Sequence, residues 1–475
     1  FSLLRRTVNV DVNGDGTIDG ADLTGAQLDE VALSTNGVSV VVDDLADLTV
    51  SGELGVARVK AANKSTTRYT GLTLGNVTLS TNSVSESLEL TAEFKIEDLD
   101  YNSAADDFER LDWTTAFDLD ADGTADLINP GAGLPTPIEL TIDFDAGLAY
   151  RLSGSLTGTG TDGVFLSVAG ITLSGGVEFA LSERFVDLQM GADTFDNAKL
   201  RTYALGVAQP VVLKVEDITA AITSGNLAVA TIKLADGTEY FGLKARDVAA
   251  TITGVPDLEG ALTGVKIDIN KATDSGGNDV TALNWLNSVD LDASGVFSAE
   301  TVGIVDPGSD LITPLSLPID FTAKLTSFAA VVEINLFDVI TVKAGFAQKD
   351  VLVDLDLNGD GTRDIDNASL TTYAVSIDQT AEDPQFVRIQ VDGVGVLISS
   401  GQLVIASIEL VDGRSFLALR ADNIAAELIG LSDIITLGIS GVGVEYNSAK
   451  DASGAASDEV LNWTTALDLD FNGVF

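Results

Sequence analysis

Acidic and amide side chains alternate along a short loop near the start of the chain, and this pattern suits a metal ion. Oxygen-bearing residues occupy positions 1, 3, 5, 7, 9 and 12 of the loop, namely Asp11, Asn13, Asp15, Thr17, Asp19 and Asp22. Gly16, at position 6, permits the sharp turn that gathers such side chains around one centre. A hard cation of calcium size binds through several oxygens in this arrangement, so the loop predicts a Ca²⁺ site. The alternative is a solvated Asp-rich turn that binds no ion.

The loop resembles the calcium loop of dockerin modules, which also ends in Asp rather than in the Glu of sensor EF-hands. A second copy begins 345 residues later, and its oxygens fall on Asp356, Asn358, Asp360, Thr362, Asp364 and Asn367. The corresponding middle stretch, residues 187–197, has lost the alternation, so we expect little or no binding there. Because dockerins pair two such loops closely in sequence, this wide separation does not predict binding to a cohesin.

A different acidic loop follows each of the three tryptophans. After Trp113 the predicted ligands are Asp118, Asp120, Asp122, Thr124 and Asp126. The two counterparts are weaker: the loop that begins at Asp290 has Ser294 at position 5, and the loop that begins at Asp468 has the amide of Asn472 there. For these two loops both binding and no binding stay open. Alternation of Asp with apolar residues is also typical of a strand end with one buried face.

The same landmarks recur along the chain. Trp113, Trp285 and Trp463 open nearly the same phrase and are separated by 172 and 178 residues. A Ser-Gly-x-Leu motif recurs at similar spacing, at residues 51–54, 224–227 and 400–403. A fixed period is the signature of a tandem array, and modules in series usually set length and surface rather than build one catalytic centre. We therefore divide the chain into a partial first copy and two further copies: 1–125, 126–297 and 298–475.

Strand signals dominate between these landmarks. Residues 212–222 and 243–252 alternate apolar and polar side chains, and Asp236-Gly237 and Asp412-Gly413 are tight-turn signals. We predict a mainly β fold in which the antiparallel meanders of tandem repeats, each of about 175 residues, stack into an elongated rod or a β-solenoid or tube-like array. Short helical turns are expected after the calcium-type loops, over residues 21–31 and 193–200.

Each tryptophan is predicted to pack in the core where one copy meets the next. The alternative, stacking on carbohydrate, would need exposed rings. Asn102, Asn270 and Asn447 each precede a short acidic or Gly/Ser loop, and we interpret them as turn residues that bond their own backbone.

Composition narrows the function classes. With 72 acidic and 26 basic residues the formal charge is −46, which repels nucleic acid and anionic membranes. Hydrophobic residues make up 45%, which excludes the disordered class. Neither Cys nor His occurs, so disulfides, thiolate chemistry and histidine-based catalysis are removed. No apolar run approaches the roughly 18 residues of a transmembrane helix. No phosphate loop, nucleophile elbow or distinctive carboxylate pair stands out, so we predict no enzymatic activity.

The long repeats, the acidity and the Asp-rich loops together resemble the repeat regions of giant bacterial exported proteins, which include large adhesins and RTX-type chains. The Gly-Gly-x-Gly-x-Asp runs of true RTX β-rolls are absent. The resemblance implies an extracellular or cell-surface protein, or a filament, that serves adhesion or cell–cell contact with bound Ca²⁺. The expected partners are adjoining copies of the repeat, and cell-surface glycans are a further candidate. The alternative is a binding module for glycans or for apolar ligands along a β-sheet groove. We expect the 475 residues to be a window of a longer protein, with targeting signals outside it.

Overall fold

The structure is a computed structural model of the 475-residue chain. It describes residues 1–42, 46–84, 89–90, 92–120, 122–168, 171–215, 217–255, 258–291, 294–298, 303–336, 339–381, 383–431 and 435–469. Within these ranges, 24 β-strands belong to one large antiparallel sheet and no α-helix is present. The prediction of a mainly β, antiparallel fold is therefore confirmed. No helix in the described part of the chain has the length and apolar character needed to cross a membrane.

The chain divides into two compact units. Unit 1 comprises Phe1–Val215, Asn226–Gly242 and Ala272–Thr322, and unit 2 comprises Glu216–Gly225, Leu243–Lys271 and Ala323–Phe475. Three strands have residues in both units: β11 (Ile218–Lys233), β12 (Glu239–Val255) and β13 (Leu258–Thr273). The three sequence copies are not tested by this division and remain a prediction.

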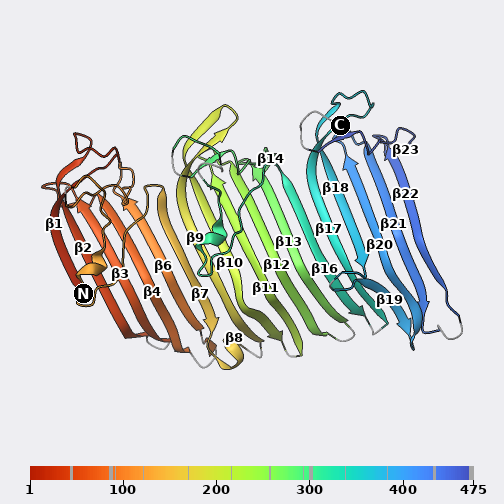
Figure 1. Cartoon of the computed structure of the whole chain (residues 1–475), viewed down its shortest axis with the longest axis horizontal. Helices are drawn as coiled ribbons and strands as arrows, with labels where there is room; N and C mark the ends of the chain where they lie inside the picture. Colours follow the sequence, from red (N-terminus) through yellow and green to blue (C-terminus); the bar gives the residue numbers. More distant parts are fainter. Residues whose placement is uncertain are drawn as a thin grey trace. The chain divides into compact units, whose positions relative to one another are not determined.

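Unit 1 is a meander in which each long strand pairs with the next long strand along the chain (Figure 1). These strands are β1 (Ser2–Val10), β2 (Leu23–Val42), β3 (Ala46–Lys60), β4 (Tyr69–Val84), β6 (Ala92–Ala104), β7 (Leu148–Gly158), β9 (Ile171–Met190) and β10 (Asp193–Val215). The short strands are β5 (Glu89–Leu90), β8 (Val164–Val168), β14 (Asp279–Val280) and β15 (Val289–Asp290).

Unit 2 continues the same pattern from β13 onward. Its long strands are β16 (Leu325–Leu336), β17 (Ile340–Leu355), β18 (Ile365–Asp378), β20 (Val394–Glu409), β21 (Ser415–Ile429) and β22 (Gly438–Lys450). Its short strands are β19 (Phe386–Val391), β23 (Ala456–Ser457) and β24 (Leu467–Asp468).

The two predicted Asp-Gly turns are confirmed. Gly237 and Gly413 both have φ of +91°, and each donates its amide to a carbonyl three residues earlier. The left-handed backbone of these positions is open to glycine at little cost.

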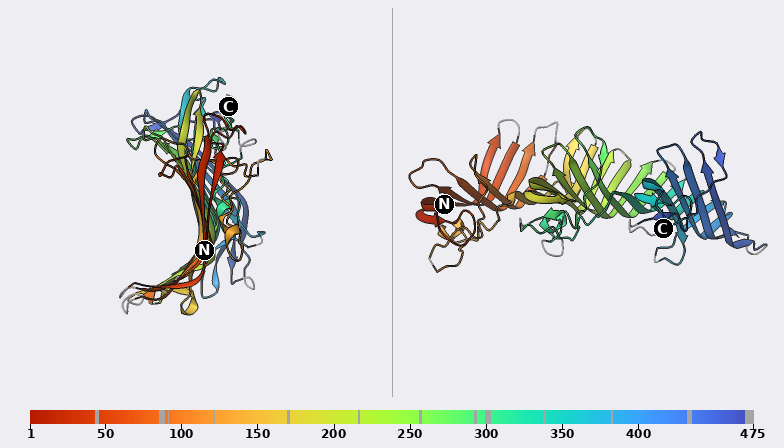
Figure 2. Two further views of the ribbon diagram at one scale, coloured as in Figure 1. Left: turned by 90° about the vertical axis from the view of Figure 1, so that its left-hand side faces the viewer. Right: turned by 90° about the horizontal axis from the view of Figure 1, so that it is seen from above.

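Two connections in unit 1 fold back over the sheet (Figure 2). The first contains the 3₁₀ turn η1 (Pro130–Gly133), which contacts β1, β2 and β3. The second contains η3 (Pro307–Asp310), which contacts β9 and β10. A third 3₁₀ turn, η2 (Thr161–Gly163), precedes β8. These two connections bury one face of the unit 1 sheet.

The helical turns predicted after the calcium-type loops are wrong at both positions. Residues 23–31 lie in β2 and residues 193–200 lie in β10. In β2 the side chains of Ala26, Leu28 and Ala32 are fully buried, which is the two-residue period of a strand. Pairing with β1 and β3 overrides the weak three-to-four-residue pattern that the sequence offers.

The tryptophans pack into hydrophobic cores. Trp113 and Trp285 are 0% and 1% exposed, whereas Trp463 is half-buried against the core of unit 2. A Cβ atom on Gly71 would lie 2.9 Å from the Trp113 ring, so this glycine lets the indole reach the sheet. Burial in the core is therefore confirmed for Trp113 and Trp285, and their rings are closed to a sugar.

Candidate metal-binding loops

The first predicted loop connects β1 to β2 and is folded by its own carboxylates. Asp11 is 7% exposed; its Oδ1 accepts the amide of Gly14 and its Oδ2 accepts the amide of Gly16, both at 2.7 Å. Asp22 closes the loop, because its two oxygens accept the amides of Val12 and Asp19 at 2.8 Å. A carboxylate has about four lone-pair sites, so each of these oxygens keeps capacity for a cation.

Asp15 lies at the exposed tip of this loop. Its Oδ1 accepts the backbone amide of Thr17 at 2.8 Å and the Thr17 hydroxyl at 2.6 Å. The Thr17 hydroxyl, followed by the Thr17 amide, lowers the pKa of Asp15 below its usual value. The carboxylate that would face a cation is therefore kept ionised.

The loop after Trp113 brings its carboxylates closest together. Oxygens of Asp118, Asp120 and Asp126 all lie within 4.8 Å of one another, the one such acidic group of three in the described part of the chain. Asp126 closes the loop: its Oδ2 accepts the amide of Leu119, and its own amide donates to the Phe117 carbonyl, both at 2.6 Å.

Asp122 and Thr124 form the exposed turn of the same loop. Asp122 Oδ1 accepts the Thr124 amide at 2.8 Å and the Thr124 hydroxyl at 2.5 Å, and these bonds lower the pKa of Asp122. Asp122 is not a member of the close group, so its predicted role as a ligand is less direct than that of Asp118.

The loop between β17 and β18 shares this design. Asp356 is 2% exposed and accepts the amides of Gly359 and Gly361 at 2.7 Å. Asp364 closes the loop by accepting the amide of Leu357 at 2.8 Å, while its own amide donates to the Leu355 carbonyl at 2.8 Å. The closing carboxylate of this loop is therefore at position 9.

Three further predicted ligands of this loop differ in their surroundings. Asn358 Oδ1 accepts the amide of Asp360 at 2.9 Å, and the Thr362 hydroxyl donates to Asp360 and lowers its pKa. Asn367, predicted at position 12, lies in β18, and its amide donates to Asp354 Oδ1 at 2.9 Å. The Asp22 role is thus taken by Asp364 here and not by Asn367.

The weaker counterpart loops are described only in part. Asp290 is fully buried, and its Oδ2 accepts the amide of Gly295 at 2.6 Å, as Asp118 Oδ2 accepts that of Gly123 at 3.0 Å. Asp292 lies outside the described residues, as do Asp470 and Asn472. Whether these two loops bind calcium stays open.

The middle hairpin, between β9 and β10, has no loop at all. The ladder continues to the Met190–Asp193 pair, so the strands are joined by a two-residue turn. Asp187 Oδ1 accepts the amide of Asn197 at 2.8 Å, which is the contact that Asp354 makes with Asn367.

Asp187 therefore corresponds to Asp354, and its alignment with the loop ligand Asp356 is wrong by two residues. The sequence carries the signal for the correct alignment. Val-Asp-Leu surrounds both acids, and Asp-Asn-Ala surrounds both asparagines, at residues 186–188, 353–355, 196–198 and 366–368.

The interpretation of the recurring asparagines as turn residues is wrong. Asn102 lies in β6 and Asn447 in β22, and each accepts the indole N–H of a tryptophan on its Oδ1. The distances are 3.0 Å from Trp113 and 3.1 Å from Trp463. Asn270, in β13, donates its Nδ2 to the Ala323 carbonyl at 2.8 Å. The buried side chains of Asn102 and Asn270 thereby satisfy polar groups that burial would otherwise leave at a cost, whereas Asn447 is exposed.

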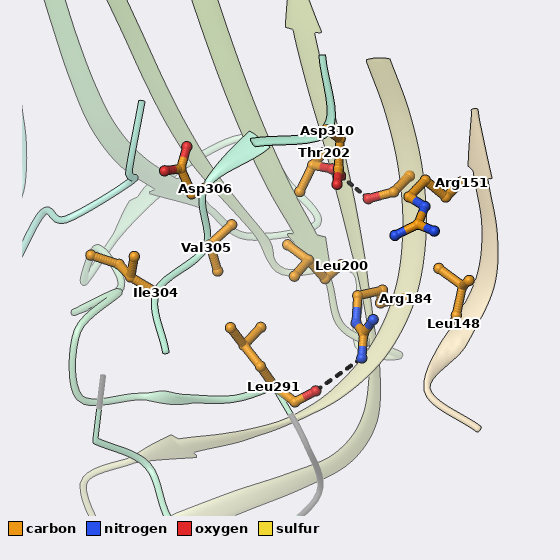
Figure 3. A pocket seen from close by; sticks show the side chains of 11 residues that line it. Leu148, Arg151, Arg184, Leu200, Thr202, Leu291, Ile304, Val305, Asp306 and Asp310 are labelled. Atoms are coloured by element: carbon orange, nitrogen blue, oxygen red, sulfur yellow. Dashed lines mark hydrogen bonds between the residues drawn. The ribbon is translucent and has the colours of Figure 1, made fainter. Parts of the chain in front are cut away.

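A cavity of about 340 Å³ lies in unit 1 between the sheet and the η3 connection (Figure 3). Arg151 and Arg184 project from β7 and β9 into this cavity, which Asp310 also lines. The carboxylate of Asp306 accepts the Leu317 amide at 2.8 Å and the Ser316 hydroxyl at 3.1 Å. Arg184 donates to Asp145 at 2.7 Å and to the Leu291 carbonyl at 3.2 Å, and Arg151 donates to Asp100 at 2.6 Å. The side chains of Arg151 and Arg184 are thus already paired with neighbouring groups of the protein, and we assign no ligand to this cavity.

Beside Arg151, one carboxyl behaves unlike those of the loops. Burial, followed by repulsion from Asp100, raises the pKa of Asp98 to about 6. Arg151 lies 3.6 Å from it and opposes this rise.

Comparison with known proteins gives no assignment. No protein-family model matches the sequence, and no curated protein matches it. Among solved structures, the chain is similar to that of Acinetobacter baumannii OccAB4, with 10% identity, a TM-score of 0.19, and coverage of 94% of this chain and 97% of that chain. At this TM-score the likeness assigns neither a fold nor a function.

Proposed function

We propose that this chain is a calcium-stabilised structural repeat region of a large extracellular surface or filament-forming protein that serves adhesion or cell–cell contact. The observation that carries this proposal is the convergence of Asp118, Asp120 and Asp126 within 4.8 Å. Three like charges at this separation repel one another strongly unless a cation lies among them. Carboxylate oxygens on a loop already folded by its own backbone amides are the ligands that Ca²⁺ prefers.

Recurring contacts support the array. The asparagine–tryptophan bond occurs at Trp113 and at Trp463. The carbonyls that accept the amides of Trp113 and Trp285 are those of Phe144 and Phe321, at 3.0 and 2.9 Å. Such recurrence is expected where one supersecondary unit is repeated and each copy packs against its neighbour. We propose that these copies stack into an elongated rod or solenoid-like array and that their main partners are adjoining copies, with cell-surface glycans as further partners.

The proposed location is the outside of a cell. Free calcium there is high enough for loops with dissociation constants of about 10⁻⁴–10⁻³ M, the range typical of extracellular modules. With a formal charge of −46, bound cations would also stabilise the folded chain, because they reduce the repulsion between its surface charges. We propose no catalytic role.

Thermal unfolding of the full chain in calcium and in chelator tests the metal part of this proposal. Each site should contribute about 2.7 kcal/mol when free calcium is a hundredfold above the dissociation constant. Magnesium is the control, because it demands a smaller and near-octahedral site. A melt that chelator leaves unchanged would contradict the proposal. Electron microscopy of the native assembly tests the rod: compact particles would refute it.

A groove in unit 2 favours the second candidate, a module that binds apolar ligands. It measures about 320 Å³ and lies on β12, β13 and β16, with Ile252, Leu262, Val332 and Ile334 in its wall. A fluorescent apolar probe should bind there and be lost on Leu262→Asp. Binding that survives this substitution would remove the candidate.

A further inference from the structure

The sheet face of unit 1 is covered in two places by a segment of the same chemistry. At the first, Leu134 and Leu140 beside η1 pack on Ala32 of β2. At the second, Leu311 beside η3 packs on Ala180 of β9 and Ala204 of β10. In each place a leucine that follows a Pro-Gly turn fills a shallow surface of small residues.

The two covering segments share their backbone bonds. Leu134 and Leu311 donate their amides to Gly131 and Gly308, at 3.2 and 3.3 Å. A Cβ on Gly131 would lie 2.3 Å from the Ile138 carbonyl oxygen, and a Cβ on Gly308 would lie 2.2 Å from the Leu315 carbonyl oxygen. Neither position can therefore hold a side chain. A Pro-Gly turn followed by leucine is therefore the common chemistry of the cover.

The described residues of unit 2 carry a similar surface and place no such cover on it. Ala347, Ala374 and Val404 stand directly opposite one another on β17, β18 and β20, so their side chains share one face. We call these three residues the unit 2 patch. It continues the core face of β18, because Leu370 lies four residues from Ala374 on the same strand.

Exposure distinguishes the two surfaces. Ala180 and Ala204 of unit 1 are cross-strand partners, as Ala347 and Ala374 are in unit 2. The unit 1 alanines are 2% and 5% exposed, whereas the unit 2 alanines are half-buried. Counted from the Ser-Gly-x-Leu motif, Val404 corresponds to Ala228. Ala228 is 0% exposed and Val404 is 46% exposed. The unit 2 patch is thus larger, more apolar and open.

Charge beside the patch favours an acidic occupant. Lys349 is exposed and pairs with Thr372, two residues along the strands from the Ala347–Ala374 pair. In unit 1 the pair at the same place, two residues from Ala180–Ala204, is Ser182–Thr202. That pair lines the cavity of Figure 3, as Asp306 and Asp310 of the cover do. Within the described residues Lys349 forms no ion pair, so an aspartate delivered by a segment like η3 would meet an unpaired cation.

Arg420 stands directly opposite Val404, but it is already paired with Asp422 at 2.5 Å and with Glu445 at 3.8 Å, so Lys349 is the cation that an acidic occupant would meet.

We propose that the unit 2 patch is the docking surface for the acidic Pro-Gly segment of a further copy of the repeat. The leucine after the turn packs on Ala347 and Ala374, beside Val404, and an aspartate of the turn pairs with Lys349. This inference rests on the repeat architecture proposed above but not on calcium.

A labelled peptide of residues 303–321, titrated into the full chain, tests the proposal. It should bind saturably, and Val404→Glu should weaken it about tenfold or more, because a charged side chain in place of valine removes the apolar contact and repels an acidic segment. Replacing the leucine of the peptide, Leu311→Ala, should weaken it as well. Lys349→Glu should weaken the native peptide and be rescued by Asp310→Lys in the peptide.

Leu417→Glu is the matched control, since Leu417 is 38% exposed and lies on the face of β21 opposite the buried Phe416. The melting temperatures of both protein variants should confirm that they fold. Absence of binding, or equal loss at Leu417→Glu and Val404→Glu, would overturn the docking proposal. If calcium still stabilises the chain in that case, the proposed function survives; if the peptide binds but calcium has no effect, only the metal proposal fails.

Discussion

The hairpins β9–β10 and β17–β18 have the same contact between their two strands just below the connection, which we call the hairpin base. They differ in the connection itself. In each hairpin an aspartate near the end of the first strand accepts the backbone amide of an asparagine in the second strand, Asn197 on Asp187 and Asn367 on Asp354. Both asparagines have a left-handed backbone, with φ of +56° and +53°. Above this contact, β9–β10 turns through two residues, whereas β17–β18 holds the nine-residue acidic loop 356–364. The β1–β2 hairpin has the same contact between Asn9 and Gly25, at 3.0 Å.

The contact at the hairpin base is therefore formed whether or not an acidic loop follows it. The same base supports an acidic loop in two places and a tight turn in a third. Calcium binding should therefore be removable without loss of the hairpin, and the hairpin should be breakable without reference to calcium. The predictions that follow separate these two contributions.

The largest effect is expected from exchanging the connections. Replacement of residues 356–364 by the Gly-Ala turn of β9–β10 should leave unit 2 folded and abolish the calcium-dependent stability of that loop. The loss is about 2.7 kcal/mol at a hundredfold excess of calcium over the dissociation constant. Denaturant unfolding with and without calcium measures it. A calcium increment that persists after the exchange would show that the ion binds elsewhere.

The base itself should be weaker where its left-handed residue is lost. Asn197→Ala and Asn367→Ala should each destabilise by about 1 kcal/mol, because a residue with Cβ and no local hydrogen bond disfavours positive φ. Glycine at either position should be neutral or slightly better. Equilibrium unfolding in chelator is the measurement, and unequal effects at the two sites would argue against a shared base.

Single carboxylates give a smaller and more specific contrast. Asp360→Ala should reduce the calcium-induced rise in melting temperature, because Asp360 is at the position-5 ligand site. Asp193→Ala, at the start of β10, should leave that rise unchanged. The two variants form a matched pair, and equal losses would refute the assignment of calcium to the loop.

The smallest effect concerns pH. Bonds from Thr362 lower the pKa of Asp360, so its contribution is present above the ordinary Asp pKa and is lost only as pH falls through the lowered value. Asp98 behaves oppositely: its pKa is raised from 3.8 to about 6, so folding favours its protonated form, and stability rises as pH falls from about 6 toward 3.8. Carbon-13 NMR of the carboxyl groups should show Asp98 titrating near 6 and Asp360 still ionised. Asp98→Asn should remove this gain, and its persistence would contradict the assignment.

Much of the fold could be predicted from local pattern. Alternating side chains and Asp-Gly pairs indicated strands and hairpins, because strand periodicity and turn stereochemistry are local properties. The stretch 21–31 was misassigned because its apolar residues fit two periods, and only pairing with neighbouring strands decides between them. The bond between Asn102 and Trp113 depends on strand register, which local spacing does not give.

The loops show the same limit. Spacing predicts ligands in three loops, but it does not predict which loop brings its carboxylates closest together. Among the described residues, the structure brings carboxylates closest at Asp118, Asp120 and Asp126, although the Asp356 loop is closed by its position-9 carboxylate in the same way. Which backbone amide each oxygen accepts is set by the folded loop and not by the spacing of acids.

Calorimetric titration of the full chain with calcium would show whether the Asp118 loop binds the ion, as we propose. Asp120→Asn is the chosen variant, because it removes one charge from the close group without altering the Asp126 closure. We expect the native chain to bind calcium and this variant to lose one site, while the sites at Asp11 and Asp356 persist. An unchanged stoichiometry and affinity in the variant, or no heat of binding by the native chain, would contradict it.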